Sequence, residues 1–172
     1  MRSLPQIFGC SHFINVDEIA HGISPLDPRS ALVRAGRIFL DLLEERLQQR
    51  EDFSFETTLS GRSNLVNIPR WQAQGWRVIL FYLYIPVPEL CILRVRQRVA
   101  TGGHDVPQED ILRRYHASLR NLFLYTDLCD HVICFDNSHS QQEPVFEKDK
   151  NEDFHIFNPE LFDSLCHTYR KK

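Results

Sequence analysis

The sequence predicts a three-layer α/β fold built on a parallel sheet, and three observations support this. Short apolar segments alternate with longer ones whose apolar residues recur every three or four positions. The strongest strand, Trp76–Ile85, is apolar on both faces, as in a parallel strand covered by helices on each side. Hydrophobic residues make up 42% and charged residues 25% of the 172 positions, which suits one globular domain.

The first part of the chain is predicted to hold two strands and two helices. Asp17 and Glu18 form a turn after the first strand. Asp27 is an N-cap and Pro28 the first residue of a long helix, and Gly75 ends the next helix. The predicted segments are strand His12–Val16, the helix from Pro28, strand Phe53–Thr58 and helix Asn64–Gln74.

The rest of the chain continues the alternation. Pro86 and Pro88 end the strongest strand, and Thr101–Gly103 separates two helices. The predicted segments are strand Trp76–Ile85, helix Glu89–Val99, a helix from Pro107 to about Phe123, strand Asp130–Phe135, a hairpin turning at Asp149–Asp153 and helix Pro159–Tyr169.

Composition excludes several classes of protein. The longest apolar run, Val78–Ile85, is too short to span a bilayer, and Met1–Phe13 does not resemble a signal peptide. Five cysteines without a Cys-x-x-Cys pair indicate reduced thiols in a cytoplasm. A net charge of −3 argues against a general nucleic-acid binder. We therefore expect a cytoplasmic protein with neither a membrane nor a nucleic acid as partner.

Lysine is distributed unevenly along the chain. Of the 20 basic residues only four are lysines, and the first of these is Lys148. A mechanism that needs a lysine between Met1 and Glu147 is therefore excluded.

Polar residues follow three of the predicted strands, where open α/β sheets bind ligands. These residues are Asn15, Asp17 and Glu18 after the first strand, Glu56, Thr57, Thr58 and Ser60 after the second, and Asp136–Ser138 after the fourth. Two carboxylates on neighbouring strand ends could serve as a base and as a ligand of a substrate or a metal. The alternative is that they are ordinary turn and cap residues. Glu56 fits that alternative least, because a strand-end carboxylate needs water, a cation or a ligand.

Arginines form a second group on the two helices around the loop Thr101–Pro107. Arg94 and Arg98 are four residues apart and share one helical face. Guanidinium groups suit phosphate oxygens, so this region could be a mobile lid over a phosphate. The alternative is a solvated helical face with intrahelical ion pairs. The group comprises Arg94, Arg96, Arg98, Arg113, Arg114 and Arg120.

Several segments together resemble the zeta-toxin family of P-loop kinases, in its chromosomal bacterial branch. They are FINVDEI (13–19), SPLDPRSALVRAGR (24–37), FETTLSGRS (55–63), TGGHDVP (101–107), ILRRYHASLRNLF (111–123) and FDNS (135–138). The resemblance implies a P-loop NTPase fold and ATP·Mg²⁺-dependent phosphoryl transfer to a hydroxyl of UDP-N-acetylglucosamine. It also implies an antitoxin protein as a partner.

The resemblance assigns roles to individual residues. Asp17 matches the aspartate that accepts the proton of the substrate hydroxyl. Glu56 and Thr57 match the pair that holds the sugar, with Asn15 and Arg62 as further substrate-binding residues. The lid arginines that neutralise the transferring phosphate correspond to Arg98 and to Arg114 or Arg113, with Arg94 as a further phosphate-binding candidate. No residue is assigned as a metal ligand.

The chain departs from the family at the phosphate-binding loop. No Gly is followed by Lys anywhere, and Met1–Cys10 resembles the end of the helix that would follow this loop. In this fold the missing strand would lie between Phe53–Thr58 and Trp76–Ile85, so its absence leaves two unpaired strand edges. The prediction is a single domain over residues 1–172, with a core at about 7–138, a lid at 94–123 and a hairpin with a helix at 139–172.

Three hypotheses follow for the function. The first is a truncated or mis-started kinase that is inactive as a 172-residue chain. The second is a pseudokinase that binds a nucleotide sugar or a protein without using ATP. The third is a decayed fragment without a function.

Overall fold

The computed structural model of the protein describes residues 10, 12–103 and 105–170. It divides the chain into two compact units, unit 1 with residues 1–57 and unit 2 with residues 58–172. The helix end expected over Met1–Cys10 lies outside the described residues, except for Cys10 itself. The single domain expected from the sequence stays a prediction.

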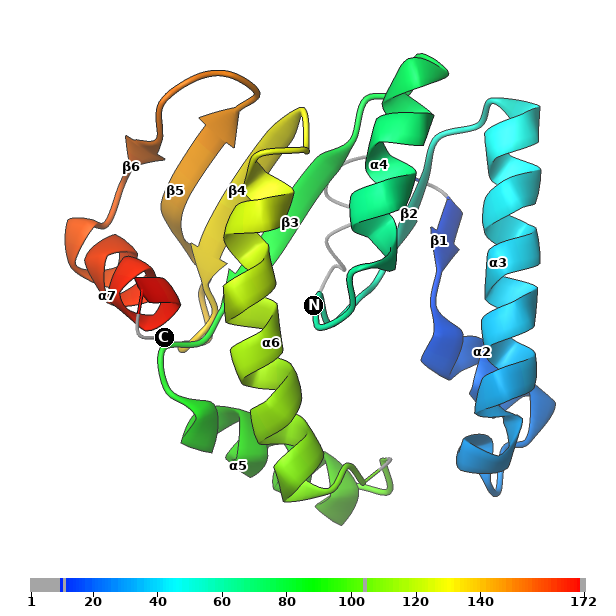
Figure 1. The fold of residues 1–172 in the computed structure, drawn as a ribbon. Coiled ribbons are helices and arrows are strands. Elements are labelled where there is room, and N and C mark those ends of the chain that lie inside the picture. Colours follow the sequence, from blue (N-terminus) through cyan, green and yellow to red (C-terminus); the bar gives the residue numbers. More distant parts are fainter. Residues whose placement is uncertain (1–9, 11, 104, 171–172) are drawn as a thin grey trace. The chain divides into compact units, whose positions relative to one another are not determined.

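Unit 1 pairs two short parallel strands with helices from the same half of the chain (Figure 1). Strands β1 (His12–Ile14) and β2 (Phe53–Phe55) pair in parallel, with His12 opposite Phe53 and Ile14 opposite Phe55. The helical elements between them are α2 (Val16–Ile23), the 3₁₀ turn η1 (Pro28–Ala31) and α3 (Leu32–Gln49). Pro28 was predicted at the start of the long helix, but it opens η1, and the long helix α3 begins at Leu32. Asp27 stands at the N-cap position of η1, but its side chain makes no capping hydrogen bond.

Small residues hold the helices of unit 1 together. Ala20, Ala31 and Ala35 are buried, and apolar side chains of α2 pack against them. Helix α2 corrects the sequence analysis, because Asp17 and Glu18 lie in its first turn and not in a loop. The Asn15 side chain accepts the N–H groups of both residues, so the chain passes from strand to helix without a turn.

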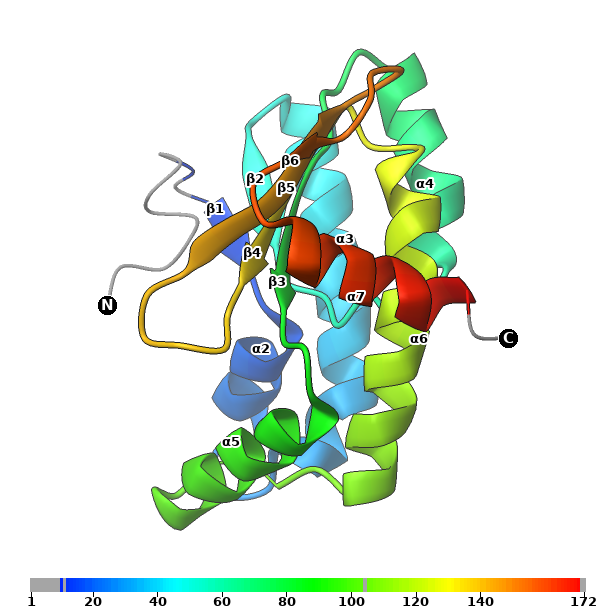
Figure 2. The same ribbon diagram turned by 90° about the vertical axis from the view of Figure 1, so that its left-hand side faces the viewer.

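Unit 2 contains a four-stranded sheet in the order β3–β4–β5–β6. Strands β3 (Ile79–Tyr84) and β4 (His131–Asp136) are parallel, while β5 (Glu143–Asp149) and β6 (His155–Ile156) are added antiparallel. The helices are α4 (Ser63–Ala73), α5 (Pro88–Ala100), α6 (Gln108–Thr126) and α7 (Pro159–Arg170). Figure 2 shows α4, α6 and α7 on the same side of this sheet.

The surroundings of β3 differ from the sequence prediction. Ile79 is 43% exposed and Leu83 37% exposed, so β3 is not covered on both faces. The reason is that the helices of unit 2 that pack on the sheet lie on one side of it. Within the described residues β1 and β2 form one sheet and β3 to β6 form another. The missing strand expected between Phe53–Thr58 and Trp76–Ile85 stays a prediction.

Within the described residues, no helix is both long enough and apolar enough to cross a membrane.

Candidate functional site

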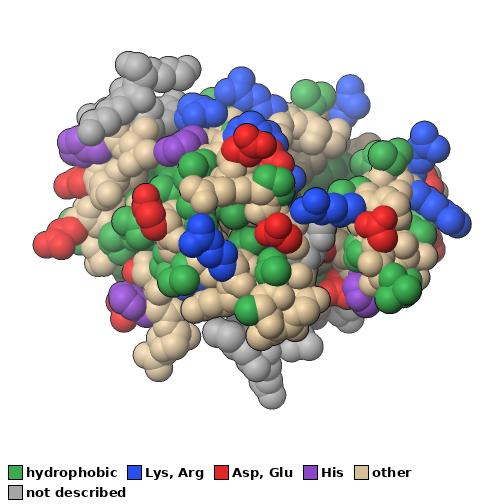
Figure 3. Space-filling model, turned by 90° about the horizontal axis from the view of Figure 1, so that it is seen from below, with side chains coloured by type: hydrophobic (Ala, Val, Ile, Leu, Met, Phe, Trp, Pro, Cys, Tyr) green, Lys and Arg blue, Asp and Glu red, His purple; other side chains and the backbone are tan. Residues whose placement is uncertain are grey.

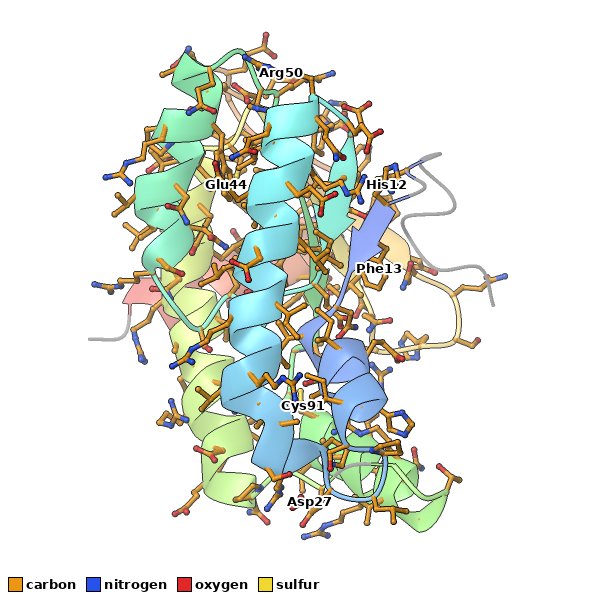
Figure 4. The ribbon with its side chains drawn as sticks, turned by 90° about the vertical axis from the view of Figure 1, so that its right-hand side faces the viewer. His12, Phe13, Asp27, Glu44, Arg50 and Cys91 are labelled. Atoms are coloured by element: carbon orange, nitrogen blue, oxygen red, sulfur yellow. The ribbon has the colours of Figure 1, made fainter. Side chains whose placement is uncertain are left out.

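Asn15, Asp17 and Glu56 lie together at the carboxyl ends of β1 and β2. The Asn15 Oδ1 atom accepts hydrogen bonds from the backbone N–H of Asp17 at 2.8 Å and of Glu18 at 3.3 Å. The Asn15 Nδ2 atom donates to Glu56 Oε2 at 2.9 Å. Figure 4 labels His12 and Phe13 on β1, the strand that leads into this cluster. Parallel pairing in register is what brings the two strand ends to one edge.

The two carboxylates of this cluster have different surroundings. Glu56 is exposed, but one of its oxygens is held by the Asn15 amide. Asp17 is exposed in the first turn of α2, and its backbone N–H donates to the capping side chain of Asn15. Thr57 follows Glu56 and is also exposed. The arrangement can present one fixed acceptor and one accessible carboxylate to a ligand hydroxyl.

Arg62, in unit 2, contacts a residue that the sequence analysis did not single out. Its Nε atom donates to Asn121 Oδ1 at 3.1 Å, and Asn121 on α6 is 3% exposed. The Asn121 Nδ2 atom donates to the carbonyl oxygen of Leu59 at 2.9 Å. The loop before α4 is therefore attached to α6 through a buried amide.

Two of the lid arginines, Arg94 and Arg113, have different partners in unit 2. Arg94 is half-buried and donates to the carbonyl oxygens of Asn137 at 2.5 Å and Ser138 at 3.4 Å, beyond the end of β4. This contact holds α5 to the segment after β4. Arg113 pairs with Asp110 on the same helix at 2.6 Å, an ion pair of the kind that the intrahelical alternative describes.

The remaining two lid arginines lie on different helices. Arg98 is exposed near the end of α5, where its carbonyl oxygen accepts the N–H of Gly103 at 2.8 Å. Arg114 is exposed on α6. Figure 3 shows Lys and Arg side chains interspersed with Asp and Glu on the face seen there. The phosphate-binding roles of Arg98, Arg113, Arg114 and Arg94 stay predictions.

A small cavity lies between α5 and the start of α6, with an accessible volume of about 160 Å³. Arg96, Asp105 and Gln108 supply its polar lining, and Arg96 Nη2 lies 3.4 Å from Gln108 Oε1. Its volume is too small for a nucleotide. Its remaining lining residues are Ile92, Val95, Val106, Pro107 and Ile111.

The residues that the structure describes do not fit ATP·Mg²⁺. The two lysines that precede the C-terminal helix lie on or next to β5, and each has a partner. Lys150 Nζ donates to Gln72 Oε1 on α4 at 2.9 Å, and Lys148 lies over the ring of Phe154. Among the described residues, no three His, Cys, Asp or Glu side chains are grouped so that they could hold a metal ion.

Two anchoring residues were missed by the sequence analysis. Asn121 lies on the face of α6 that also buries Leu122 and Tyr125, so a polar residue at a buried helical position was the available signal. Tyr115 donates its hydroxyl to the carbonyl oxygens of Ile85 at 3.0 Å and Pro86 at 2.9 Å. Burial raises the pKa of Tyr115 above its ordinary value.

The chain is similar to a curated bacterial protein and to a solved structure. No protein-family model matches the chain. A Haemophilus influenzae (strain Rd) protein, described as an uncharacterized protein, is 34% identical over 102 residues, which cover 59% of this chain and 73% of that protein. A solved chain from the PezAT chromosomal toxin–antitoxin system of Streptococcus pneumoniae has a TM-score of 0.59, with 12% identity. It covers 98% of this chain and 70% of that one, and this likeness supports the zeta-toxin-like fold.

Proposed function

Because the chain belongs to one family with the Haemophilus influenzae protein and has a zeta-toxin-like fold, we propose that it binds a nucleotide sugar. In this proposal it forms the substrate-binding part of a small-molecule phosphotransferase, and the ligand is of the UDP-N-acetylglucosamine type. The observation that supports the proposal is the Asn15–Glu56 hydrogen bond, which joins two strand ends beside Asp17.

The two carboxylates take different parts in this proposal. Glu56 accepts a hydrogen bond from the sugar, because one of its oxygens is already fixed by Asn15. Asp17 accepts the hydrogen bond of the hydroxyl that would be phosphorylated, since it is an exposed carboxylate in the adjoining turn. Thr57 provides a further hydroxyl for the sugar.

Phosphoryl transfer is a separate part of the proposal. No Gly is followed by Lys within the 172 residues, so we expect them to bind the ligand without consuming ATP. A longer chain that joins a phosphate-binding loop to these residues should transfer phosphate, and Asp17→Asn should abolish that transfer. ATP consumption by the 172-residue chain, lost on Asp17→Asn, would contradict the first expectation.

Titration calorimetry with UDP-N-acetylglucosamine tests ligand binding directly. We expect Glu56→Gln to weaken binding about tenfold, the usual effect of losing one charged hydrogen bond. Asp41→Asn is the matched control, because Asp41 is an exposed acid on α3 and is not one of the residues of the proposed site. Absence of binding by the unsubstituted chain to any nucleotide sugar would overturn the proposal.

We also propose an antitoxin-like protein as a partner, because the similar structure comes from a toxin–antitoxin system. Co-expression with the product of the adjacent gene, followed by size-exclusion chromatography, tests this. Separate elution of the two proteins at micromolar concentration would count against it.

A further inference from the structure

We infer that Asn15 is a positioning residue, which fixes Glu56 as an acceptor for the sugar end of the ligand. The inference rests on the proposed function and assigns Asn15 a role that differs from direct substrate binding. It starts from the position of Asn15, whose side chain connects the start of α2 with the end of β2.

The helix start determines how the Asn15 amide is oriented. The backbone N–H groups of Asp17 and Glu18 both need an acceptor, so the amide oxygen must face them. An amide is planar, and fixing its oxygen therefore fixes the direction of its N–H groups. One of these groups points to Glu56 Oε2 at 2.9 Å. The cap of α2 thus sets the orientation of a carboxylate 41 residues away in the sequence.

Capping alone does not require asparagine. Serine, threonine and aspartate cap helices about equally well, but none of them combines the acceptor with an N–H donor. Helix α7 provides a comparison, because Asn158 Oδ1 accepts the N–H of Leu161 at 3.1 Å as its cap. An exposed hydrogen bond such as Asn15–Glu56 adds little to stability, so its main consequence is the orientation of Glu56.

The charge of the cluster indicates which end of the ligand it contacts. Asp17, Glu18 and Glu56 bring three carboxylates to the carboxyl ends of β1 and β2, and these carboxylates repel phosphate groups. A fixed carboxylate oxygen instead favours groups that donate hydrogen bonds, such as sugar hydroxyls and the acetamido N–H. The cluster therefore suits the uncharged sugar, with the diphosphate pointing away from it.

A double-mutant cycle on ligand affinity tests the role of Asn15. We expect Asn15→Ser, which keeps the cap but cannot reach Glu56, to weaken UDP-N-acetylglucosamine binding about tenfold. In a Glu56→Ala background the same substitution should change the affinity less than about twofold, because its effect passes through Glu56. Asn15→Asp should weaken binding at least as much, since it keeps the cap and places a negative charge beside Glu56.

Controls separate this inference from the proposed function. Asn158→Ser removes an equivalent cap amide and should leave the affinity unchanged, with thermal stability affected as little as by Asn15→Ser. An equal effect of Asn15→Ser with and without Glu56 would overturn the positioning role, and so would an unchanged affinity. Failure of the unsubstituted chain to bind any nucleotide sugar would instead overturn the proposed function, and the positioning role with it.

Discussion

Arg62 and Asn121 are hydrogen-bonded across 59 residues of sequence, with 3.1 Å between Nε and Oδ1. The guanidinium is on an exposed residue, while the amide is buried on α6. The same amide donates to the carbonyl of Leu59, a buried residue whose φ of 55° lies in the left-handed region. Tyr125 adds a hydrogen bond to the carbonyl of Gly61 at 3.0 Å. The loop before α4 is thus held in an unfavourable backbone conformation by side chains of α6.

Asn121→Leu should destabilise the protein by about 2 kcal/mol, because it leaves the carbonyl of Leu59 without its donor. Urea unfolding followed by circular dichroism measures the loss. Arg62→Ala is the matched variant and should cost less than about 1 kcal/mol, since Arg62 is exposed. Equal losses for the two variants would show that Asn121 does not anchor the loop.

Gly103→Ala should destabilise the turn between α5 and α6. A Cβ atom at Gly103 would lie 2.4 Å from Arg98 Cγ and 2.9 Å from the Arg98 carbonyl oxygen. The side chain of Arg98 can move, but its carbonyl is fixed by the hydrogen bond from the Gly103 N–H. Overpacking of this kind costs roughly 1–3 kcal/mol. A lower thermal midpoint in scanning calorimetry is the expected result.

Gly36→Ala is the control for Gly103→Ala. Gly36 lies inside α3, and a Cβ atom there meets nothing within 4 Å. Alanine should therefore stabilise the helix by up to about 1 kcal/mol. If both alanine variants moved the midpoint in the same direction, the explanation by close contact at Gly103 would be wrong.

The order of strands and helices was largely predictable, because the spacing of apolar residues indicates the type of each element and Pro or Gly residues mark most of the ends. Helix α2 was the exception. Asp17 and Glu18 suit a turn, but they also suit the first turn of a helix, and the cap at Asn15 decides between the two. The predicted strand Trp76–Ile85 begins later, at Ile79, because the N–H of Val78 is bound by the Asp130 carboxylate before strand pairing starts.

The candidate site was predictable only where strand geometry defines it. Parallel strands end at one edge, so the proximity of Asn15 and Glu56 follows from the two predicted strands. Both strands begin where they were predicted, at His12 and Phe53, but they end earlier, at Ile14 and Phe55. The partners of Arg94 and Arg62 could not be predicted in this way. Arg94 binds backbone carbonyl groups and Arg62 binds a side chain, and the tertiary fold brings these groups near the arginines. No spacing along the sequence indicates such partners.

Asp130 should make the stability of unit 2 depend on pH. Partial burial by itself would raise the pKa of Asp130. A hydrogen bond from the Val78 N–H and one from Gln72 outweigh it, and the charges of Lys150 and Arg77 add to them, so the pKa of Asp130 lies below its ordinary value. The stabilisation is therefore present above the pKa of the unfolded chain, about 4, and is lost as pH falls through the lower folded value.

Asp130→Asn tests this pH dependence. The variant keeps an acceptor for Val78 but has no charge, so it should be less stable than the unsubstituted protein at pH 7. The difference in unfolding free energy should shrink below about pH 4, where the carboxyl becomes protonated. Asp127→Asn, at an exposed acid next to the end of α6, is the control. A difference that stays constant from pH 7 to pH 3 would contradict the assignment.

The cysteines should fall into two classes of thiol reactivity. Cys129 is 2% exposed, and burial raises its pKa to about 12. Cys134 is fully buried, and burial raises its pKa as well. Both thiols are therefore protonated at neutral pH and shielded from reagents. Cys10, Cys91 and Cys166 are partly exposed and should provide every thiol that reacts quickly in the folded chain.

Titration with an aromatic disulfide reagent distinguishes the two classes. The folded protein should release at most three equivalents of thiolate quickly, and urea should expose the other two of the five cysteines. Cys129→Ser and Cys134→Ser should each reduce only the slow class, which identifies its members. Fast reaction of either residue in the folded chain would show that the core around β4 opens far more often than its burial implies, because a thiol held protonated inside a packed sheet reacts only after that opening.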